Sequence, residues 1–336
     1  MSGFKVAWKH ALAAFATAVL ATCPALAEVA ELKITKQPGL LFTPTLLMEH
    51  HKLVEKHAKA AGLDVKVEWV TLLSGGAAND ALLSGNVQVV TSGVSNMLLL
   101  WGKTNGNVKA FQGISGLPFK LITRNPNIKT IKDYTAKDRI ALPTVRMSMQ
   151  AITLGIALQK VYGDDKANEK LLANQVQMGH PDALAALMNP GHEVTSHFAA
   201  SPFQEIALKD PAIRTVLESK DALGGDAHVA LAYAITRFYD ENPKTVRAFL
   251  AAYDEAVAMI KNDPKTVAVT YLQLVKEKAT AEDVVQLLTQ PGAIFQAAPV
   301  RTMVYADYMA KAGFIKPHPK SWKDYFFPLL HDREGS

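Results

Sequence analysis

The sequence predicts an α/β protein of two lobes, each built on a doubly wound sheet. Strand-like runs alternate with helical patterns along most of the chain, and glycine, proline or serine follows most of these runs. The chain has 336 residues, which is more than one hydrophobic core usually serves. With 49% hydrophobic and 20% charged residues, its composition is that of a folded globular protein and excludes disorder or multi-span membrane topology.

The first unit shows a strand-then-helix order three times. We predict its strands at residues 32–36, 65–70 and 87–91. A helix from Thr43 to about Ala61 follows the first strand, and a short helix that ends before Gly85 follows the second. Parallel neighbours need crossovers of this length, so the order predicts a parallel sheet with helices on its faces.

The second unit begins near Leu117 and has a similar rhythm without a detectable repeat. We predict strands at residues 139–142, 174–178 and 193–197, and a helix at 148–161. After Gly224 one strand, at 228–236, gives way to helices that begin at Asn242-Pro243, Asp263-Pro264 and Thr280.

This late helical tail should pack back on the first sheet, because its apolar faces need something to cover. Lobe I is therefore expected to hold residues 28–116 and 230–336, and lobe II residues 117–229. The chain would then cross between the lobes near residues 115–125 and 222–235.

The N-terminus is typical of an exported chain. Lys5 and Lys9 precede a small and apolar run at residues 11–21, and Ala25-Leu26-Ala27 offers a cleavage site. We predict a signal peptide at residues 1–27 and a mature start at Glu28. The run is shorter than the ~20 residues that span a bilayer.

The only cysteine, Cys23, lies inside this segment. A lipid-anchored Cys23 is the alternative to cleavage after Ala27, but Thr22 and Pro24 beside it disfavour a lipobox. After cleavage, the mature chain would have no disulfide, no thiolate nucleophile and no cysteine metal ligand.

Several other functions find little support in the sequence. The formal charge of +5 is spread along the chain without a basic tract, which argues against nucleic acid as a partner. His180, His192 and His197 occupy different predicted elements and lack regular ligand spacing, so we expect no metal. No P-loop, dinucleotide-binding glycines or nucleophile elbow occurs, so we expect no cofactor and no catalytic residues.

Four segments together resemble a known family. They are residues 73–76 followed by 81–87, residues 91–94, residues 141–143 at the start of a helix, and residues 198–203. Their order and spacing are similar to those of the taurine, alkanesulfonate and nitrate branch of periplasmic substrate-binding proteins for ABC transporters. The resemblance covers residues 28–330 and implies the hinged, two-lobe periplasmic-binding-protein fold of type II. It also implies that a solute binds in the cleft and that the closed form docks on an ABC permease with its ATPase.

Three junctions between a strand and a helix are the candidates for binding a small anion. Unpaired amides at a helix N-terminus carry a partial positive charge and suit an anion without an ion pair. The candidate ligand-binding residues at these junctions are Ser74, Gly75, Ser92, Gly93, Val94 and Ser148. Each serine also has the simpler interpretation of a helix cap. In the family, a glycine often stands where this chain has Met147, which leaves Ser148 as the donor and puts sulfonate specificity in question.

Other residues could recognise the rest of the solute. Phe42, on the loop after the first strand, and His197 and Phe198, after a strand of the second unit, are expected where the lobes face each other. Arg146 is the candidate for a bidentate clamp on an anion. A buried or capping histidine and a solvated arginine are the alternatives at His197 and Arg146.

Together these features predict the periplasmic solute-binding component of an ABC importer, monomeric and not an enzyme. Its solute is expected to be small, organic and anionic, either sulfonate-like and similar to taurine or an aromatic carboxylate. Nitrate is less favoured, because the aromatic positions suggest a larger solute. An exported sensor or scaffold subunit with the same fold remains open, and so does a protein that binds or makes a pyrimidine precursor. The cysteine-rich motif of the related thiamine-pyrimidine synthase has no counterpart here.

Overall fold

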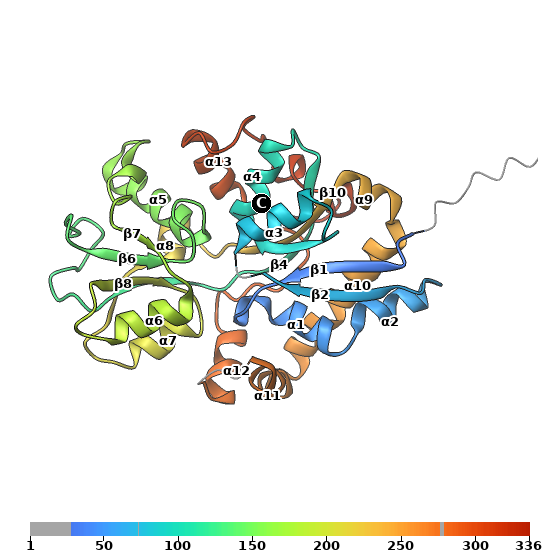
Figure 1. The fold of residues 1–336 in the computed structure, drawn as a ribbon, viewed down its shortest axis with the longest axis horizontal. Helices are drawn as coiled ribbons and strands as arrows, with labels where there is room; N and C mark the ends of the chain where they lie inside the picture. Colours follow the sequence, from blue (N-terminus) through green and yellow to red (C-terminus); the bar gives the residue numbers. More distant parts are fainter. Residues whose placement is uncertain (1–27, 73, 276–278) are drawn as a thin grey trace, which may run out of the picture.

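The computed structural model describes residues 28–72, 74–275 and 279–336 of the protein. The predicted signal peptide and the alternative lipid site at Cys23 lie outside the described residues. The structure has two halves side by side, each with its own strands covered by helices (Figure 1). We call the half with the N-terminal strands lobe I and the half with the five-stranded sheet lobe II. No helix in these described ranges is long and apolar enough to cross a membrane.

Lobe I contains a mixed sheet rather than the parallel sheet predicted. Its strands are β1 (Glu31–Lys36), β2 (Lys66–Thr71), β3 (Val90–Gly93), β4 (Val108–Ser115) and β10 (Ala230–Ile235). β1 and β2 are parallel, and a parallel bridge from Ile34 to Val89 connects β1 to the β3 segment. β10 lies between β3 and β4 and runs antiparallel to both. The difference arises because β10 re-enters lobe I from lobe II and so approaches from the opposite end.

The helices of lobe I largely follow the predicted starts. They are α1 (Thr43–His50), α2 (Leu53–Ala60), α3 (Gly75–Leu83), α4 (Val94–Lys103), α9 (Thr236–Glu241), α10 (Pro243–Asn262), α11 (Pro264–Val275), α12 (Ala281–Thr289) and α13 (Met303–Lys311). Thr280 forms a capping box with Asp283 at the start of α12. The single helix predicted from Thr43 to Ala61 was wrong, because Lys52 adopts a left-handed backbone that separates α1 from α2.

Lobe II has a five-stranded sheet in the order β7-β6-β8-β5-β9. Its strands are β5 (Lys120–Thr123), β6 (Arg139–Leu142), β7 (Gln175–Gln177), β8 (Val194–Ala199) and β9 (Arg214–Glu218), and its helices are α5 (Met149–Tyr162), α6 (His180–Met188), α7 (Phe203–Leu208) and α8 (Ser219–Leu223). β6 is parallel to β7 and β8, whereas β5 is antiparallel to β8 and β9. β8 extends to Ala199, so Phe198 as well as His197 lies inside the strand, whereas the predicted strand ended at His197.

The largest hydrophobic cluster belongs to both lobes. Leu98 of α4, Ile152 of α5 and Tyr305 and Met309 of α13 are fully buried in it. α13 therefore packs against α4 of lobe I and α5 of lobe II, and it lies above the boundary between the lobes in Figure 1. The C-terminal helix covers both halves instead of lobe I alone, while the residue boundaries of the two lobes stay a prediction.

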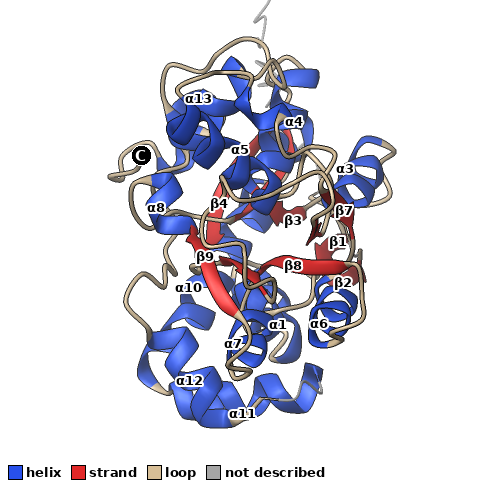
Figure 2. Ribbon diagram, turned by 90° about the vertical axis from the view of Figure 1, so that its left-hand side faces the viewer, coloured by secondary structure: helices blue, strands red, loops and turns tan. Residues whose placement is uncertain are grey.

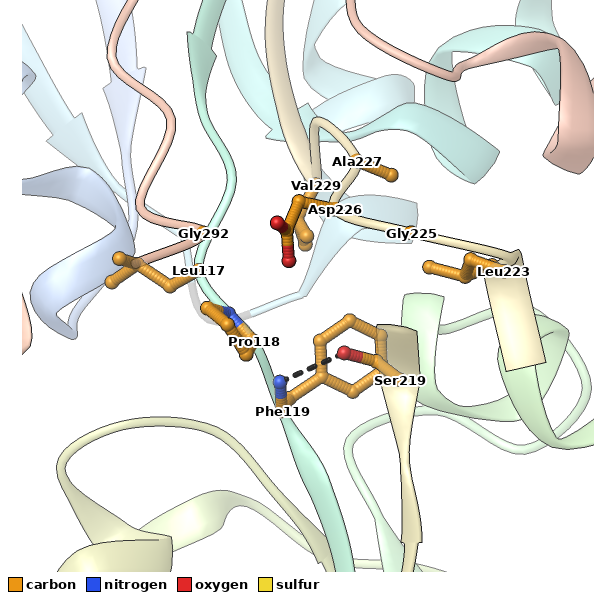
Figure 3. A pocket seen from close by; sticks show the side chains of 10 residues that line it. All are labelled: Leu117, Pro118, Phe119, Ser219, Leu223, Gly225, Asp226, Ala227, Val229 and Gly292. Carbon is orange, nitrogen blue, oxygen red and sulfur yellow. Dashed lines mark hydrogen bonds between the residues drawn. The ribbon is translucent and has the colours of Figure 1, made fainter. Parts of the chain in front are cut away.

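Two segments cross between the lobes, at residues 116–119 and 224–229, and they lie next to each other (Figure 3). Figure 2 shows the molecule from the lobe II end, with α13 beside α4 and α5. The backbone N–H of Gly116 donates to the Ile294 carbonyl at 2.9 Å, and the Val229 N–H donates to the Ser115 carbonyl at 2.8 Å. A Cβ at Gly116 would lie 2.1 Å from the carbonyl oxygen of Ala227. The crossing segments are thus in backbone contact at a position where only glycine fits.

Candidate functional site

The carboxyl ends of the two sheets meet where the lobes face each other. In lobe I, β3 ends at Gly93 and leads directly into α4; in lobe II, β6 is followed by the loop that leads into α5. The Ser95 hydroxyl donates to the Met147 carbonyl at 2.7 Å, and the Ser95 N–H donates to the Met149 sulfur at 3.3 Å. We call the meeting of Gly93 and Ser95 with Met147 and Met149 the interlobe junction. In open α/β sheets, ligands bind outside the carboxyl ends of the strands.

On the lobe I side of the interlobe junction, hydrogen bonds hold a buried hydroxyl. Ser92 is fully buried, and its Oγ accepts from Gln37 Nε2 at 3.0 Å and from Asn96 Nδ2 at 3.2 Å. Asn96 is fixed in turn, because Asn79 Nδ2 donates to its carbonyl at 3.0 Å. The Tyr233 hydroxyl donates to Asn79 at 2.6 Å. These contacts join β1, β3, α3, α4 and β10 at one edge, so the hydroxyl of Ser92 has a fixed position.

Some backbone N–H groups at the N-termini of α3, α4 and α5 already have hydrogen-bond partners within the protein. Ser74 and Ser148 cap α3 and α5, since each hydroxyl accepts a backbone N–H three residues later at 3.2 Å. The Val94 N–H donates to the Val229 carbonyl at 3.0 Å. The capping interpretation of both serines is therefore correct, and their contact with a solute stays a prediction.

A Cβ would crowd a neighbouring side chain at two of the predicted glycine positions. A Cβ at Gly75 would lie 2.0 Å from Nδ2 of Asn96, and a Cβ at Gly93 would lie 3.0 Å from Cγ of Met149. Gly75 lets α3 approach α4 within lobe I. Gly93 lets α5 of lobe II approach the start of α4, so it bears directly on how closely the lobes meet.

A pair of histidines lies at the corresponding edge of lobe II. His197 of β8 is fully buried, and its Nε2 lies 2.9 Å from Nδ1 of His180, the first residue of α6. His180 is half-buried, its Nε2 lies 3.4 Å from Nε2 of Gln150, and its ring stacks on Phe203 with centroids 5.5 Å apart. His197 Nδ1 has no partner among the described residues.

Both imidazoles are neutral at neutral pH. Burial lowers the pKa of His180 to about 4. Burial, together with the neighbouring His180, holds the pKa of His197 well below its usual value. The pair can therefore offer neutral hydrogen-bonding groups but no positive charge.

The structure places three predicted residues in hydrophobic cores. Phe42 packs in the cluster of lobe I, Val94 is fully buried, and Phe198 packs on Phe119 with ring centroids 5.3 Å apart. The aromatic side chain that sequence reasoning missed is Phe203, which is partly exposed and stacks on His180. The position of His180 at the start of a helix could have marked it as a site residue. Its contact with His197 could not be predicted, because the two residues lie in different elements.

Arg146 is not part of the interlobe junction. Its side chain is exposed, its backbone is left-handed with φ 67°, and it lines a separate cavity against α13. The pocket beside the crossing segments, into which Asp226 points in Figure 3, encloses about 10 Å³, room for a single water. It is too small for an organic solute. Within the described residues, no three His, Cys, Asp or Glu side chains cluster in a way that could hold a metal ion.

Comparison with known proteins identifies the fold. No family model matches the chain, and no curated protein matches it. Among solved structures, the periplasmic aliphatic sulphonate binding protein of Escherichia coli is similar, with 18% identity, a TM-score of 0.67, and 89% of this chain and 92% of that chain covered. The alkanesulfonate-binding protein of Xanthomonas axonopodis pv. citri, bound to MOPS, has 16% identity, a TM-score of 0.69, and covers 90% and 99%.

A third similar structure is a Candida albicans protein described as having the generic periplasmic binding protein structural fold. It has 12% identity and a TM-score of 0.66, and the match covers 89% of this chain and 96% of that one. At these identities the likeness shows the fold alone. The chain has the periplasmic binding protein fold, and the resemblance seen in the sequence is confirmed at that level.

Proposed function

We propose that this protein is the periplasmic solute-binding component of an ABC importer and that it binds a small anionic organic solute at the interlobe junction. The observation that carries the proposal is the contact between the carboxyl ends of the two sheets, where Ser95 of lobe I bonds Met147 and Met149 of lobe II. Two of the similar structures are sulfonate-binding proteins, which supports a sulfonate-like solute. An aromatic carboxylate is the second class. Both classes of anion suit recognition by neutral donors and helix N-termini. Lys36, next to Gln37 at the edge of lobe I, is already paired with Glu49 at 2.6 Å, so its charge is not free for the solute.

The solute would act by favouring the closed arrangement of the lobes. A solute that contacts both lobes stabilises the form in which they meet, whereas one that contacts a single lobe shifts nothing. In this scheme Ser92 holds the solute from lobe I, and His180 with Phe203 holds it from lobe II. The chain would be exported through its signal peptide, act as a monomer without a catalytic step, and dock on a permease served by an ATPase.

Thermal shift of the chain from Glu28 tests this function. The panel holds four classes: sulfonates (methanesulfonate and taurine), aromatic carboxylates (benzoate and phthalate), nitrate, and pyrimidines. We expect one of these classes to raise the melting temperature in a concentration-dependent way, since a solute that binds only the folded chain stabilises it by mass action. Ser92→Ala should weaken affinity for that class by at least about tenfold, because a fixed hydroxyl near the anion is lost.

Ser196→Ala is the matched control. Ser196 is also a fully buried serine, and its hydroxyl donates to Thr123 Oγ1 at 2.8 Å within the sheet of lobe II. It should lose stability much as Ser92→Ala does and keep the affinity of the parent chain. Equal affinity in both variants would remove Ser92 from the site, and no shift with any compound would contradict the proposed function.

Gly93→Leu tests whether closure of the lobes is needed for binding. Gly93 has φ −60° and ψ 146°, which any residue adopts, so the backbone accepts leucine. The new side chain would instead press on Met149 across the lobes, and we expect affinity for the solute to fall by at least about tenfold. Calorimetric titration of Gly93→Leu, Met149→Ala and the double variant measures the effect. The double variant should regain part of the affinity, and full affinity in Gly93→Leu alone would contradict a closed binding form.

A further inference from the structure

A second set of polar side chains lies apart from the interlobe junction. Arg146, Glu169 and Gln175 of lobe II line one cavity together with Tyr308 of α13 and Phe314 just after it. The cavity has a volume of about 90 Å³, which is far more than the single-water pocket beside the crossing segments and is room for several waters. An occupant therefore has few non-hydrogen atoms and touches both lobe II and the C-terminal helix.

Two opposite charges line this cavity without being paired. Both side chains are exposed, and within the part of the chain that the structure describes neither the Arg146 guanidinium nor the Glu169 carboxylate has a hydrogen-bond or ion-pair partner. Other arginines of lobe II are engaged: Arg124 pairs with Asp210 at 2.7 Å, and Arg139 donates to the Ala136 carbonyl at 2.8 Å.

The backbone of Arg146 is held beside further polar groups that line the cavity. Arg146 keeps a left-handed conformation, and its N–H donates to Gln175 Oε1 at 3.2 Å. The Nε2 group of Gln175 and the hydroxyl of Tyr308 have no partner among the described residues. Burial raises the pKa of Tyr308 to about 12, so its hydroxyl stays protonated and can donate. The cavity thus offers several donors beside the cation and one carboxylate acceptor.

We propose that this cavity is a binding site for a small zwitterion of the size of glycine, with its carboxylate on Arg146 and its ammonium on Glu169. A guanidinium matches a carboxylate with two parallel hydrogen bonds. An ion of one sign would contact only one of the two charged side chains, whereas a zwitterion contacts both. The site does not depend on the function proposed above, since it lies outside the interlobe junction.

Titration of the chain from Glu28 with glycine, acetate and methylamine, followed by ligand-observed NMR, tests this site. We expect glycine to bind with a Kd on the order of 1 mM, and acetate and methylamine at least about tenfold more weakly. Arg146→Asn and Glu169→Gln should each weaken glycine binding by at least about tenfold. Asparagine is chosen because it tolerates the left-handed backbone of position 146.

Three further variants separate the site from nonspecific charge effects. Lys166→Gln and Glu193→Gln remove exposed charges that do not line the cavity, so both should bind glycine as the parent chain does. Ala312→Leu fills the cavity without changing a charge and should weaken binding. The site is overturned if glycine binds equally well to Arg146→Asn and Glu169→Gln, if acetate binds as tightly as glycine, or if the folded chain gives no signal at about ten times the expected Kd.

Discussion

Gly116→Ala should lower the free energy of unfolding by about 3 kcal/mol. A Cβ at this position would lie 2.1 Å from the Ala227 carbonyl oxygen and 3.2 Å from Cα of His228. These are backbone atoms, so no rotation of a side chain relieves the contact, and the two crossing segments must move apart. That movement weakens the hydrogen bonds between Gly116 and Ile294, at 2.9 and 2.8 Å. Urea unfolding followed by far-UV circular dichroism measures the loss.

Gly76→Ala is the matched control for this substitution. Gly76 lies in the first turn of α3, and a Cβ there would have nothing within 4 Å. Because alanine is the better helix former, this variant should be as stable as the parent chain or gain up to about 1 kcal/mol. If Gly116→Ala were as stable as Gly76→Ala, that result would contradict the close backbone contact between the crossing segments.

Acidification from pH 7 to pH 5 should remove about 2 kcal/mol of stability through His228 alone. Burial lowers the pKa of His228 to about 4. Its Nδ1 accepts the Val300 N–H at 3.0 Å, and its Nε2 contacts the Gln296 carbonyl at 3.1 Å, so the folded chain needs the neutral ring.

The sign follows from proton binding in the two states. Between pH 6.5 and about 4 the unfolded chain holds a proton on His228 that the folded chain does not, so stability rises with pH. It is fully present above pH 6.5 and is lost as the pH falls towards 4. His180 and His197 act in the same direction, because burial lowers their pKa values too.

Variants at two histidines isolate the contribution of His228. His228→Asn keeps an acceptor for the Val300 N–H and removes the titrating ring, so its stability should fall between pH 7 and pH 5 by about 2 kcal/mol less than that of the parent chain. His318→Asn makes the same exchange at a half-exposed histidine that pairs with Asp307 on the surface, and it controls for the effect of the histidine-to-asparagine substitution itself. A parent-like slope in His228→Asn would contradict a neutral buried ring. Urea unfolding at a series of pH values supplies the data.

The sequence predicted helices and strands well where their bounds depend on residues close together in the chain. β6 has the predicted bounds, and Pro243 and Pro264 begin α10 and α11 as proline at a first helical turn suggests. The capping box at Thr280 was visible as Thr280 followed by Asp283. Each of these features depends on residues within a few positions, so no distant contact had to be known.

Predictions at the site depended on distant contacts and were less complete. The strand predicted to end at His197 continues through Phe198 to Ala199, because β8 pairs with both β5 and β6. Arg146 was expected at the face between the lobes, whereas its loop turns it towards α13. The contact of Met149 with Ser95 could not be predicted, since the two residues belong to different lobes.

The sequence by itself determined the alternation of strands and helices, the division into two α/β lobes and two crossings of the chain, predicted near residues 115–125 and 222–235. It could do so because periodicity and helix breakers act over a few residues. Only the tertiary structure decided that β10 runs antiparallel in lobe I, that α13 covers both lobes, and that His180 meets His197. These features follow from burial and hydrogen bonding between segments far apart in the chain. The segments that pack against a side chain fix its direction, and a single sequence does not show which segments these are.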